Sequence, residues 1–103
     1  MGEPLVGEQR YAPTEDAAGR VIDGEALLVL PARGEAVVLN AVASRMWELI
    51  EAAAPVSAIV QAIIDEYDVS EEIAQRDVTR FCEDLHRRRF IAPISEVAAG
   101  QRS

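Results

Sequence analysis

The side chains best equipped for chemistry in this sequence are its single cysteine and its single histidine, Cys82 and His86. Their spacing would place both side chains on one face of a helix. Two ligands do not complete a zinc site, which needs three or four. The sequence offers no further cysteine or histidine. We therefore interpret the pair as a half-buried cysteine beside a solvated histidine.

The acidic residues show no catalytic arrangement either. The pairs Glu71–Glu72 and Glu83–Asp84 are adjacent in sequence, so their side chains diverge around a helix and are interpreted as solvated. The sequence has no glycine-rich run of the kind that cradles a phosphate. It thus predicts no catalytic residues, no metal ligands and no cofactor, and hence a protein that is not an enzyme.

Length and charge limit the classes of protein that fit. The 103 residues make one small domain, and half of them are hydrophobic, which is typical of a globular chain. A net charge of −8 argues against a nucleic-acid-binding protein, because such proteins present a basic face. The single cysteine excludes an internal disulfide, and neither a membrane-length apolar run nor a signal peptide is present. We expect a soluble, cytoplasmic protein with no nucleic-acid or membrane partner.

The elements that must position the remaining side chains begin with strands. Residues 1–19 carry prolines and glycines without a sustained period, which predicts a flexible N-terminal segment, extended or mobile. Asp23–Gly24 is a two-residue hairpin signal that leads into the apolar run 26–30. Gly34 suits a left-handed turn position, and residues 36–39 are a further strand-like run. The sequence therefore predicts a meander of three antiparallel strands.

After the strands the apolar period changes from two to 3.6. Asn40 is the expected N-cap of a first helix that Pro55 ends, Ser57 caps a second helix, and Ser70 caps a third that closes at Arg87–Arg89. The expected buried stripes are Val42, Met46, Leu49, Ile50 and Ala53, flanked by Trp47; then Ile59, Val60, Ile63, Ile64 and Tyr67; then Ala74, Val78, Phe81 and Leu85.

This order of elements predicts an α+β fold, a winged helix-turn-helix-like domain in which a three-stranded antiparallel meander precedes three helices. The domain spans residues 20–93, and residues 94–103 form a C-terminal tail. Alternation gives the meander apolar residues on both faces, with Leu27 and Val29 opposite Leu28 and Leu30. Helices can cover one face. The N-terminal segment, a partner chain or a bound peptide could cover the other, so a homodimer stays open.

Residues 39–50, Leu-Asn-Ala-Val-Ala-Ser-Arg-Met-Trp-Glu-Leu-Ile, resemble the signature of the PqqD-like family. Members show Leu-Asn at the start of a helix, then an aliphatic–Trp pair and a Leu one turn later. The resemblance covers about residues 20–91. It also rests on Asp23–Gly24, the run to Leu30, Gly34, Val37–Val38, Ser57–Val60, Tyr67–Val69, Asp77–Val78, Phe81 and Leu85. The chain departs from the family at Ala43–Ser44, where Gly-Ala is common, and at Arg89, where a Gly is common.

The resemblance implies a peptide-binding chaperone without catalytic residues. PqqD-like proteins recognise the leader segment of a ribosomally synthesised precursor peptide and present it to a modifying enzyme. That partner is a radical SAM protein in the founding pathway, and a leader peptidase with its cyclase machinery in lasso-peptide pathways. The family's leader adds as a strand to the third strand of the meander and packs against the third helix.

Carried onto this sequence, the resemblance implies a site on that strand and that helix. The expected peptide-binding residues are Glu35, Ala36, Val37, Val38, Leu39, Ile73, Asp77, Arg80, Phe81 and Asp84. Arg80 would bind a leader carboxylate, and Asp77 or Asp84 a cationic or hydrogen-bonding residue. Alternatively these three form ordinary ion pairs along the helix, Asp77 to Arg80 or Arg80 to Asp84. The opposite flank of the helix, Gln75, Cys82 and His86, is the other candidate face.

Two further functions compete with peptide recognition. A winged-helix DNA-binding transcription regulator shares this order of elements, but its recognition helix should be basic and exposed. Here residues 71–88 mix arginines with Glu and Asp, which suits a polyphosphate poorly. A general adaptor that docks its apolar sheet face on a larger enzyme is the third reading, and it differs from the first only in its ligand.

Overall fold

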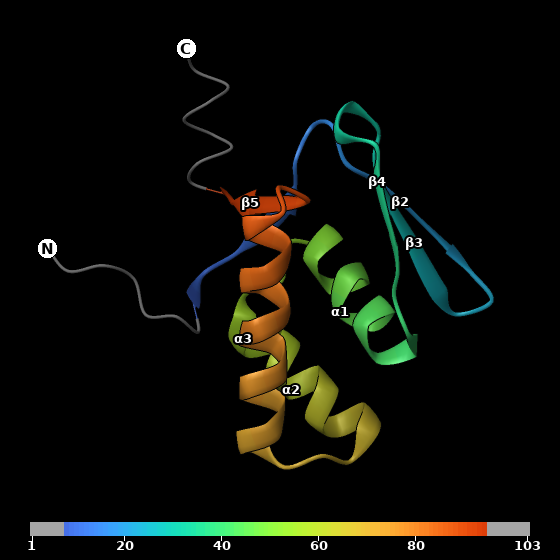
Figure 1. Cartoon of the computed structure of the whole chain (residues 1–103). Coiled ribbons are helices and arrows are strands. Elements are labelled where there is room, and N and C mark those ends of the chain that lie inside the picture. Colours follow the sequence, from blue (N-terminus) through green and yellow to red (C-terminus); the bar gives the residue numbers. More distant parts are fainter. Residues whose placement is uncertain (1–7, 95–103) are drawn as a thin grey trace, which may run out of the picture.

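A computed structural model describes residues 8–94 of the chain (Figure 1). Its elements are β1 (Tyr11–Pro13), β2 (Ala18–Ile22), β3 (Glu25–Leu30), the short 3₁₀ helix η2 (Pro31–Arg33), β4 (Glu35–Val38), α1 (Ala41–Glu51), α2 (Val56–Tyr67), α3 (Glu71–Arg87) and β5 (Ile91–Pro93). The predicted α+β class, with three antiparallel strands followed by three helices, is confirmed. No helix in the described part has the length and apolarity needed to cross a bilayer.

The meander is a sheet of order β2–β3–β4 with two tight connections. Ile22 pairs with Glu25, which leaves Asp23 and Gly24 as the two turn residues, both in the left-handed region (φ 52° and 80°). The hairpin predicted at Asp23–Gly24 is therefore confirmed. Gly34, at φ 65°, lets the chain leave η2 and enter β4. These turns fix the register of β4, which lies at one edge of the sheet.

Two strands reach into the segment predicted to be flexible. β1 pairs antiparallel with β5, with Ala12 opposite Ala92, and β2 already begins at Ala18. Tyr11 is buried, so this part of residues 1–19 belongs to the packed structure. A three-residue strand that ends in proline has no periodicity to detect, and its partner lies near the other end of the sequence. Residues 1–7 and 95–103 lie outside the described part, and the domain boundaries remain predictions.

The helix caps match the sequence at two of three positions. The Asn40 side chain accepts a hydrogen bond from the Ala43 N–H (2.8 Å), and the Ser70 hydroxyl accepts one from the Ile73 N–H (3.2 Å). Ser57 is not a cap, because the N-cap of α2 is Pro55, two residues earlier, and Ser57 lies within the first turn of the helix. The extended backbone of Pro55 (ψ 154°) already directs its carbonyl to the N–H groups of the first turn.

Trp47 lies in the centre of the core, with 1% of its surface exposed, and not at the flank of the α1 stripe. The reason is that α1 packs against β3 as well as α2, so its buried surface is wider than one stripe. The indole lies directly against the backbone of Gly19, where a Cβ would also meet Leu28. Ala53 also leaves the predicted stripe, because α1 ends at Glu51 and Ala53 takes a left-handed conformation.

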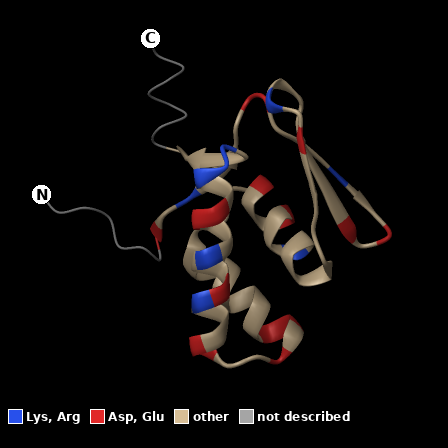
Figure 2. Ribbon diagram, in the orientation of Figure 1, with Lys and Arg blue, Asp and Glu red and all other residues tan. Residues whose placement is uncertain are grey.

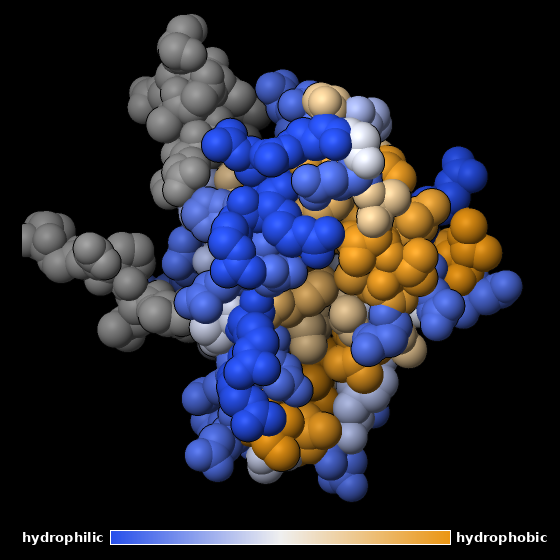
Figure 3. All heavy atoms as spheres, viewed as in Figure 1, coloured by the Kyte–Doolittle hydropathy of each residue, from blue (hydrophilic) through white to orange (hydrophobic). Residues whose placement is uncertain are grey.

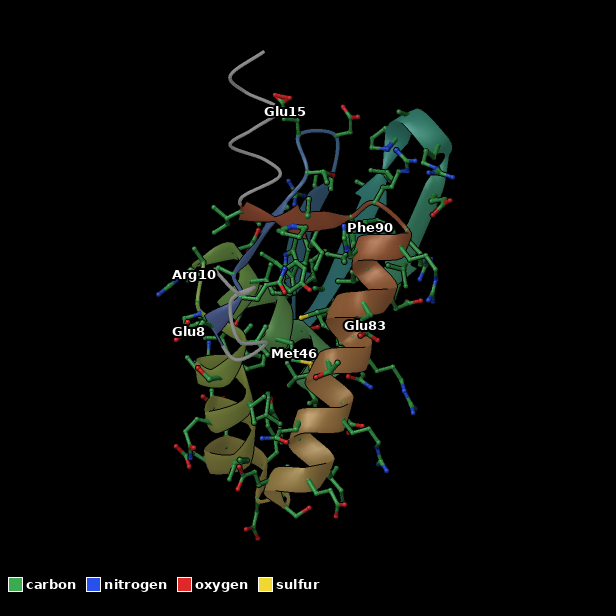
Figure 4. The ribbon with its side chains drawn as sticks, turned by 90° about the vertical axis from the view of Figure 1, so that its left-hand side faces the viewer. Glu8, Arg10, Glu15, Met46, Glu83 and Phe90 are labelled. Carbon is green, nitrogen blue, oxygen red and sulfur yellow. The ribbon has the colours of Figure 1, made fainter. Side chains whose placement is uncertain are left out.

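A buried serine joins α1 to the sheet. The Ser44 hydroxyl accepts a hydrogen bond from the Ala26 N–H (2.6 Å) and donates one to the Leu39 carbonyl (3.2 Å). At the other end of the molecule, β5 lies across the end of α3 beside Phe90, and Arg10 lies beside the start of α2 (Figure 4). The Arg10 guanidinium donates to the Ala53 carbonyl there (2.7 Å). These hydrogen bonds join α1 to β3 and to the end of β4, and the N-terminal segment to the loop between α1 and α2.

Candidate functional site

The outer edge of β4 is the first part of the candidate site. The Leu39 N–H bonds to the Ala26 carbonyl, and Leu28 lies opposite Val37. Hydrogen-bonded pairs alternate along an antiparallel ladder. The N–H and C=O groups of Val37 therefore face β3, whereas those of Ala36 and Val38 point away from the sheet. Both Ala36 and Val38 are exposed, so β4 offers backbone groups to a further strand.

The second part is a hollow of about 660 Å³ between α1, the end of α2 and α3. We call it the central hollow. Its wall on α3 includes Asp77, Arg80, Phe81 and Asp84. Its other lining residues are Asn40, Val42, Ala43, Met46, Ile63, Tyr67, Val69, Glu83 and Arg87. Figure 3 shows apolar side chains gathered over α1 and β4 beside the hydrophilic column of α3.

A second hollow of about 490 Å³ lies at the opposite end of β4, and we call it the arginine hollow. Arg87 lines both hollows. The central hollow includes Asn40, just after β4, and the arginine hollow includes Arg33, just before it. The linings described for the two hollows include no residue of β4 (Glu35–Val38) itself, so the candidate site consists of these two hollows and the free strand edge that runs between Arg33 and Asn40. We call this whole feature the α3–β4 groove.

The structure brings part of the predicted site together. Asp77, Arg80, Phe81 and Asp84 line the central hollow, while Ile73 is 41% exposed but lies outside its lining. On β4, Ala36 and Val38 are exposed, Glu35 and Val37 are partly buried, and Leu39 is a core residue beyond the strand. Leu39 packs inwards because it lies two residues after Val37, and alternate residues of an extended chain point to the same side.

Phe81 was expected on the buried stripe of the third helix, and the structure corrects this. Phe81 is only partly buried, and Cys82 takes the core position with 2% of its surface exposed. The inner face of α3 therefore runs along Ala74, Val78, Cys82 and Leu85. This rotation turns Phe81 towards the central hollow, where an aromatic ring can contact a ligand.

The two flanks of α3 lie in different surroundings. Cys82 is in the core, and Gln75 lies on a separate hollow beside α2. His86 lies near the ring of Tyr11, with centroids 6.1 Å apart. The flank with Asp77, Arg80 and Asp84 lines the central hollow together with residues of α1 and the end of α2.

The charges of that flank do not form the ion pairs expected along the helix. Asp77 lies 3.6 Å from Arg76, and Asp84 contacts Arg87 and Arg88. Within residues 8–94, no carboxylate oxygen lies within ion-pair distance of the Arg80 guanidinium, which is exposed. The central hollow therefore has an unpaired cation beside an apolar floor. Figure 2 shows that the exposed face of α3 carries charges of both signs.

Sequence reasoning missed the floor of the central hollow. Val42, Ala43 and Met46 of α1 and Tyr67 of α2 supply it. Only the small side chain of Ala43 hints at a close approach, and the sequence does not show which face of α1 stays open to solvent. The floor depends on how three helices pack.

Cys82 and His86 do not form a reactive pair. Burial, with a smaller effect of the Glu83 carboxylate, raises the pKa of the Cys82 thiol to about 12, so the thiol is protonated at neutral pH. Among the residues that the structure describes, no group of three or more His, Cys, Asp or Glu side chains could hold a metal ion. The groove offers a ligand backbone groups, apolar contacts and charges.

Comparisons with known proteins agree with this geometry. Residues 25–91 match the family described as coenzyme PQQ synthesis protein D (PqqD). One solved structure, "TbiB1 in Complex with the TbiA(beta) Leader Peptide", is 30% identical with a TM-score of 0.74, over 78% of this chain and 93% of that one. Another, "Lasso peptide synthetase B1 complexed with the leader peptide", is 19% identical with a TM-score of 0.75, over 82% and 99%. No curated protein matches the chain.

Proposed function

This chain belongs to the PqqD family, and we propose that it binds the leader segment of a ribosomally synthesised precursor peptide and presents it to a modifying enzyme. The observation that carries the proposal is the α3–β4 groove, which combines a free strand edge with a side-chain hollow. Its 30%-identical structural neighbour is a complex with a leader peptide. We infer the class of ligand of this chain from the leader peptide in that complex.

Strand addition supplies the affinity in this mechanism. An extended leader would pair with the N–H and C=O groups of Ala36 and Val38 and become a fourth strand of the sheet. Main-chain bonds of this kind tolerate many sequences. Recognition of a particular leader must then come from side chains.

The central hollow supplies that recognition. Alternate leader side chains would point across the groove towards Phe81 and Met46, and an apolar side chain fits between them. The unpaired Arg80 would bind a leader carboxylate, and Asp77 a cationic or hydrogen-bonding side chain.

The chain acts in this proposal as a non-catalytic partner. The modifying enzyme is a radical SAM protein or a leader peptidase with its cyclase, and the bound leader would bring the rest of the precursor to it. Binding that orders a leader costs several kcal/mol of the interaction energy. We therefore expect a dissociation constant between about a micromolar and a nanomolar.

The test is an NMR titration of the ¹⁵N-labelled chain with a synthetic peptide, the leader half of the precursor encoded beside it. We expect saturable amide shifts at Ala36 and Val38, whose N–H groups gain a partner, and along Asp77–Asp84. The Val37 N–H, which already faces β3, should shift less. Absence of shifts at the β4 edge, or shifts at Arg87–Arg89 with duplex DNA instead, would reject leader binding and favour the regulator.

A further inference from the structure

Within the described part of the chain, three arginines and one aspartate line the arginine hollow. They are Arg33, Arg87, Arg89 and Asp16, and the other lining residues among residues 8–94 are Thr14, Leu30, Ala32, His86, Ile91 and Ala92. In a chain of net charge −8, this concentration of cations in one concave surface stands out. Figure 2 shows basic residues both at the end of α3 beside β5 and in the turn before β4.

The guanidiniums of this hollow keep hydrogen-bonding capacity for a ligand. Arg33 lies 3.7 Å from Glu35, and Arg87 contacts Asp84. Each guanidinium has five N–H donors, so one carboxylate does not saturate it. For Arg89, no carboxylate within residues 8–94 lies at ion-pair distance. Of the lining residues between positions 8 and 94, Asp16 is the one that is acidic.

The backbone of Arg89 adds a second, independent observation. Arg89 takes the left-handed conformation, with φ 70°, which glycine adopts without strain and other residues rarely adopt. Its N–H donates to the His86 carbonyl (3.0 Å), and its carbonyl accepts from the Thr14 hydroxyl (2.8 Å). The main chain is therefore held at this turn, and an arginine side chain is placed on the hollow at a position where a glycine would be less strained. Strain of this kind points to a functional reason for the side chain.

A strand added to β4 would continue towards this hollow. Arg33 comes two residues before Glu35, at the end of β4 farthest from α1, and Arg87 connects this hollow to the central one. A peptide paired with Ala36 and continuing past Glu35 advances about 3.3 Å per residue. Its next few residues therefore pass over the arginine hollow.

We propose that the arginine hollow binds an acidic side chain of the same precursor peptide, two to four residues beyond the residue paired with Ala36. This inference rests on the proposed function and names a specificity element for it. Arg89 is the principal contact, with Arg33 and Arg87 at its sides. A leader with a carboxylate at this position would be favoured over the same leader with an amide.

The first test needs no leader. Acetyl-triglutamate amide and acetyl-triglutamine amide are titrated into the ¹⁵N-labelled full chain at low salt. We expect saturable, salt-sensitive shifts at Arg33, Arg89 and Ala92 with triglutamate alone, and at least fivefold weaker binding by Arg89→Gln and Arg89→Gly. Arg76→Gln is the matched control, because Arg76 is exposed on α3 outside this hollow. Equal shifts with both peptides, or equal binding by the Arg89 and Arg76 variants, would overturn the inference.

Arg89→Gly also separates binding from folding. Glycine adopts the left-handed conformation without strain. The Tm of the Arg89→Gly variant should therefore equal or exceed that of the wild type, while its triglutamate binding falls. A Tm well below that of the wild type would show that Arg89 is structural and overturn the proposal. If leader peptide shifts Ala36 and Val38 normally but Arg89→Gly binds it unchanged, the acidic contact fails and leader binding stands. If the leader does not shift that edge, leader binding itself fails.

Discussion

Ser44 shows how one buried hydroxyl can hold the strand that carries the site. Its side chain bonds both the Ala26 N–H and the Leu39 carbonyl, where β3, β4 and α1 meet. Ser44→Ala would leave a buried N–H without a partner, and we expect a loss of about 1–3 kcal/mol in the free energy of unfolding. Ser57→Ala is the control, because Ser57 is exposed and is not a cap, and it should change stability by less than about 0.5 kcal/mol. Urea unfolding measures both, and equal losses would contradict this role.

Gly19 is required by its neighbour and not by its backbone angles. A Cβ at this position would lie 2.6 Å from Trp47 Nε1 and 2.9 Å from its Cε2. A buried indole cannot move aside easily, so we expect Gly19→Ala to destabilise the fold by about 1–3 kcal/mol. The fluorescence of Trp47, the chain's one tryptophan, reports the unfolding directly. Gly24→Asn is the control, since no atom lies near that Cβ and Asn tolerates a positive φ. Wild-type stability in Gly19→Ala would refute the close contact.

Cys82 gives the fold a pH dependence at alkaline pH. Its pKa is raised from 9.0 to about 12, mainly by burial. Between these values the unfolded chain loses a proton that the folded chain keeps, so stability is full below pH 9 and falls as the pH rises towards 12. From pH 8 to pH 10 we expect a loss of about 1 kcal/mol from this thiol, at about 1.4 kcal/mol per pKa unit. Urea unfolding of wild type and Cys82→Ala at both pH values isolates it. Identical pH dependence would exclude the effect.

Residues whose role depends on nearby sequence were predictable, and residues whose role depends on a distant partner were not. Asn40 and Ser70 cap helices that start beside them. Trp47, Ser44 and Phe81 depend on where the sheet and α3 lie, and their positions came only with the structure. The sequence identified Arg89 as a position where the family commonly has glycine. It did not show whether the arginine keeps the left-handed conformation that a glycine would take there.

At the scale of elements, the pairing of the leader with the outer edge of β4 can be tested without unfolding the sheet. Val38→Pro removes an N–H that points away from β3, whereas Val37→Pro removes one that faces it. We expect Val38→Pro to weaken leader binding at least tenfold with a small change in stability, and Val37→Pro to destabilise the fold strongly. Fluorescence anisotropy of a labelled leader and urea unfolding give the two readouts. Unchanged affinity in Val38→Pro would show that the leader does not add to β4.

Helices and strands also differ in whether nearby or distant sequence determines them. The hairpin at Asp23–Gly24 and the three helices have local signals, and both are present where the sequence places them. β1 and β5 have only three residues each, and each is stabilised by the other. Packing stabilises these short strands, through the buried Tyr11 and the contact of β5 with α3, so no local sequence pattern predicts them.

For the whole molecule, the candidate site is a product of assembly. The α3–β4 groove combines hollows lined by residues of α1, α2 and α3 with the free edge of β4, and no single stretch of sequence contains it. The resemblance to a family supplied the strand and the helix that form its walls. The floor, the flank of α3 that faces it and the unpaired Arg80 follow from packing and needed the structure.

The joining of the two ends of the described chain yields a last prediction. β1 pairs with β5, the Gln9 carbonyl accepts from the Val56 N–H (2.9 Å), and the Ile94 N–H bonds to the Arg10 carbonyl (3.0 Å). A chain lacking residues 1–13 loses these bonds and the buried ring of Tyr11. Compared with a chain lacking residues 1–7, it should be less stable by about 2–4 kcal/mol.

The same truncation should also weaken binding at the α3–β4 groove. Without β1, β5 loses its pairing partner, and the end of α3 that carries Arg87 and Arg89 loses its support. We therefore expect leader affinity to fall together with stability when residues 8–13 are removed. Urea unfolding and leader anisotropy on the two truncated chains provide the comparison. Equal stability would mean that the domain begins near residue 20, as the sequence predicts. Lower stability with full leader affinity would mean that β1 supports the fold without shaping the site.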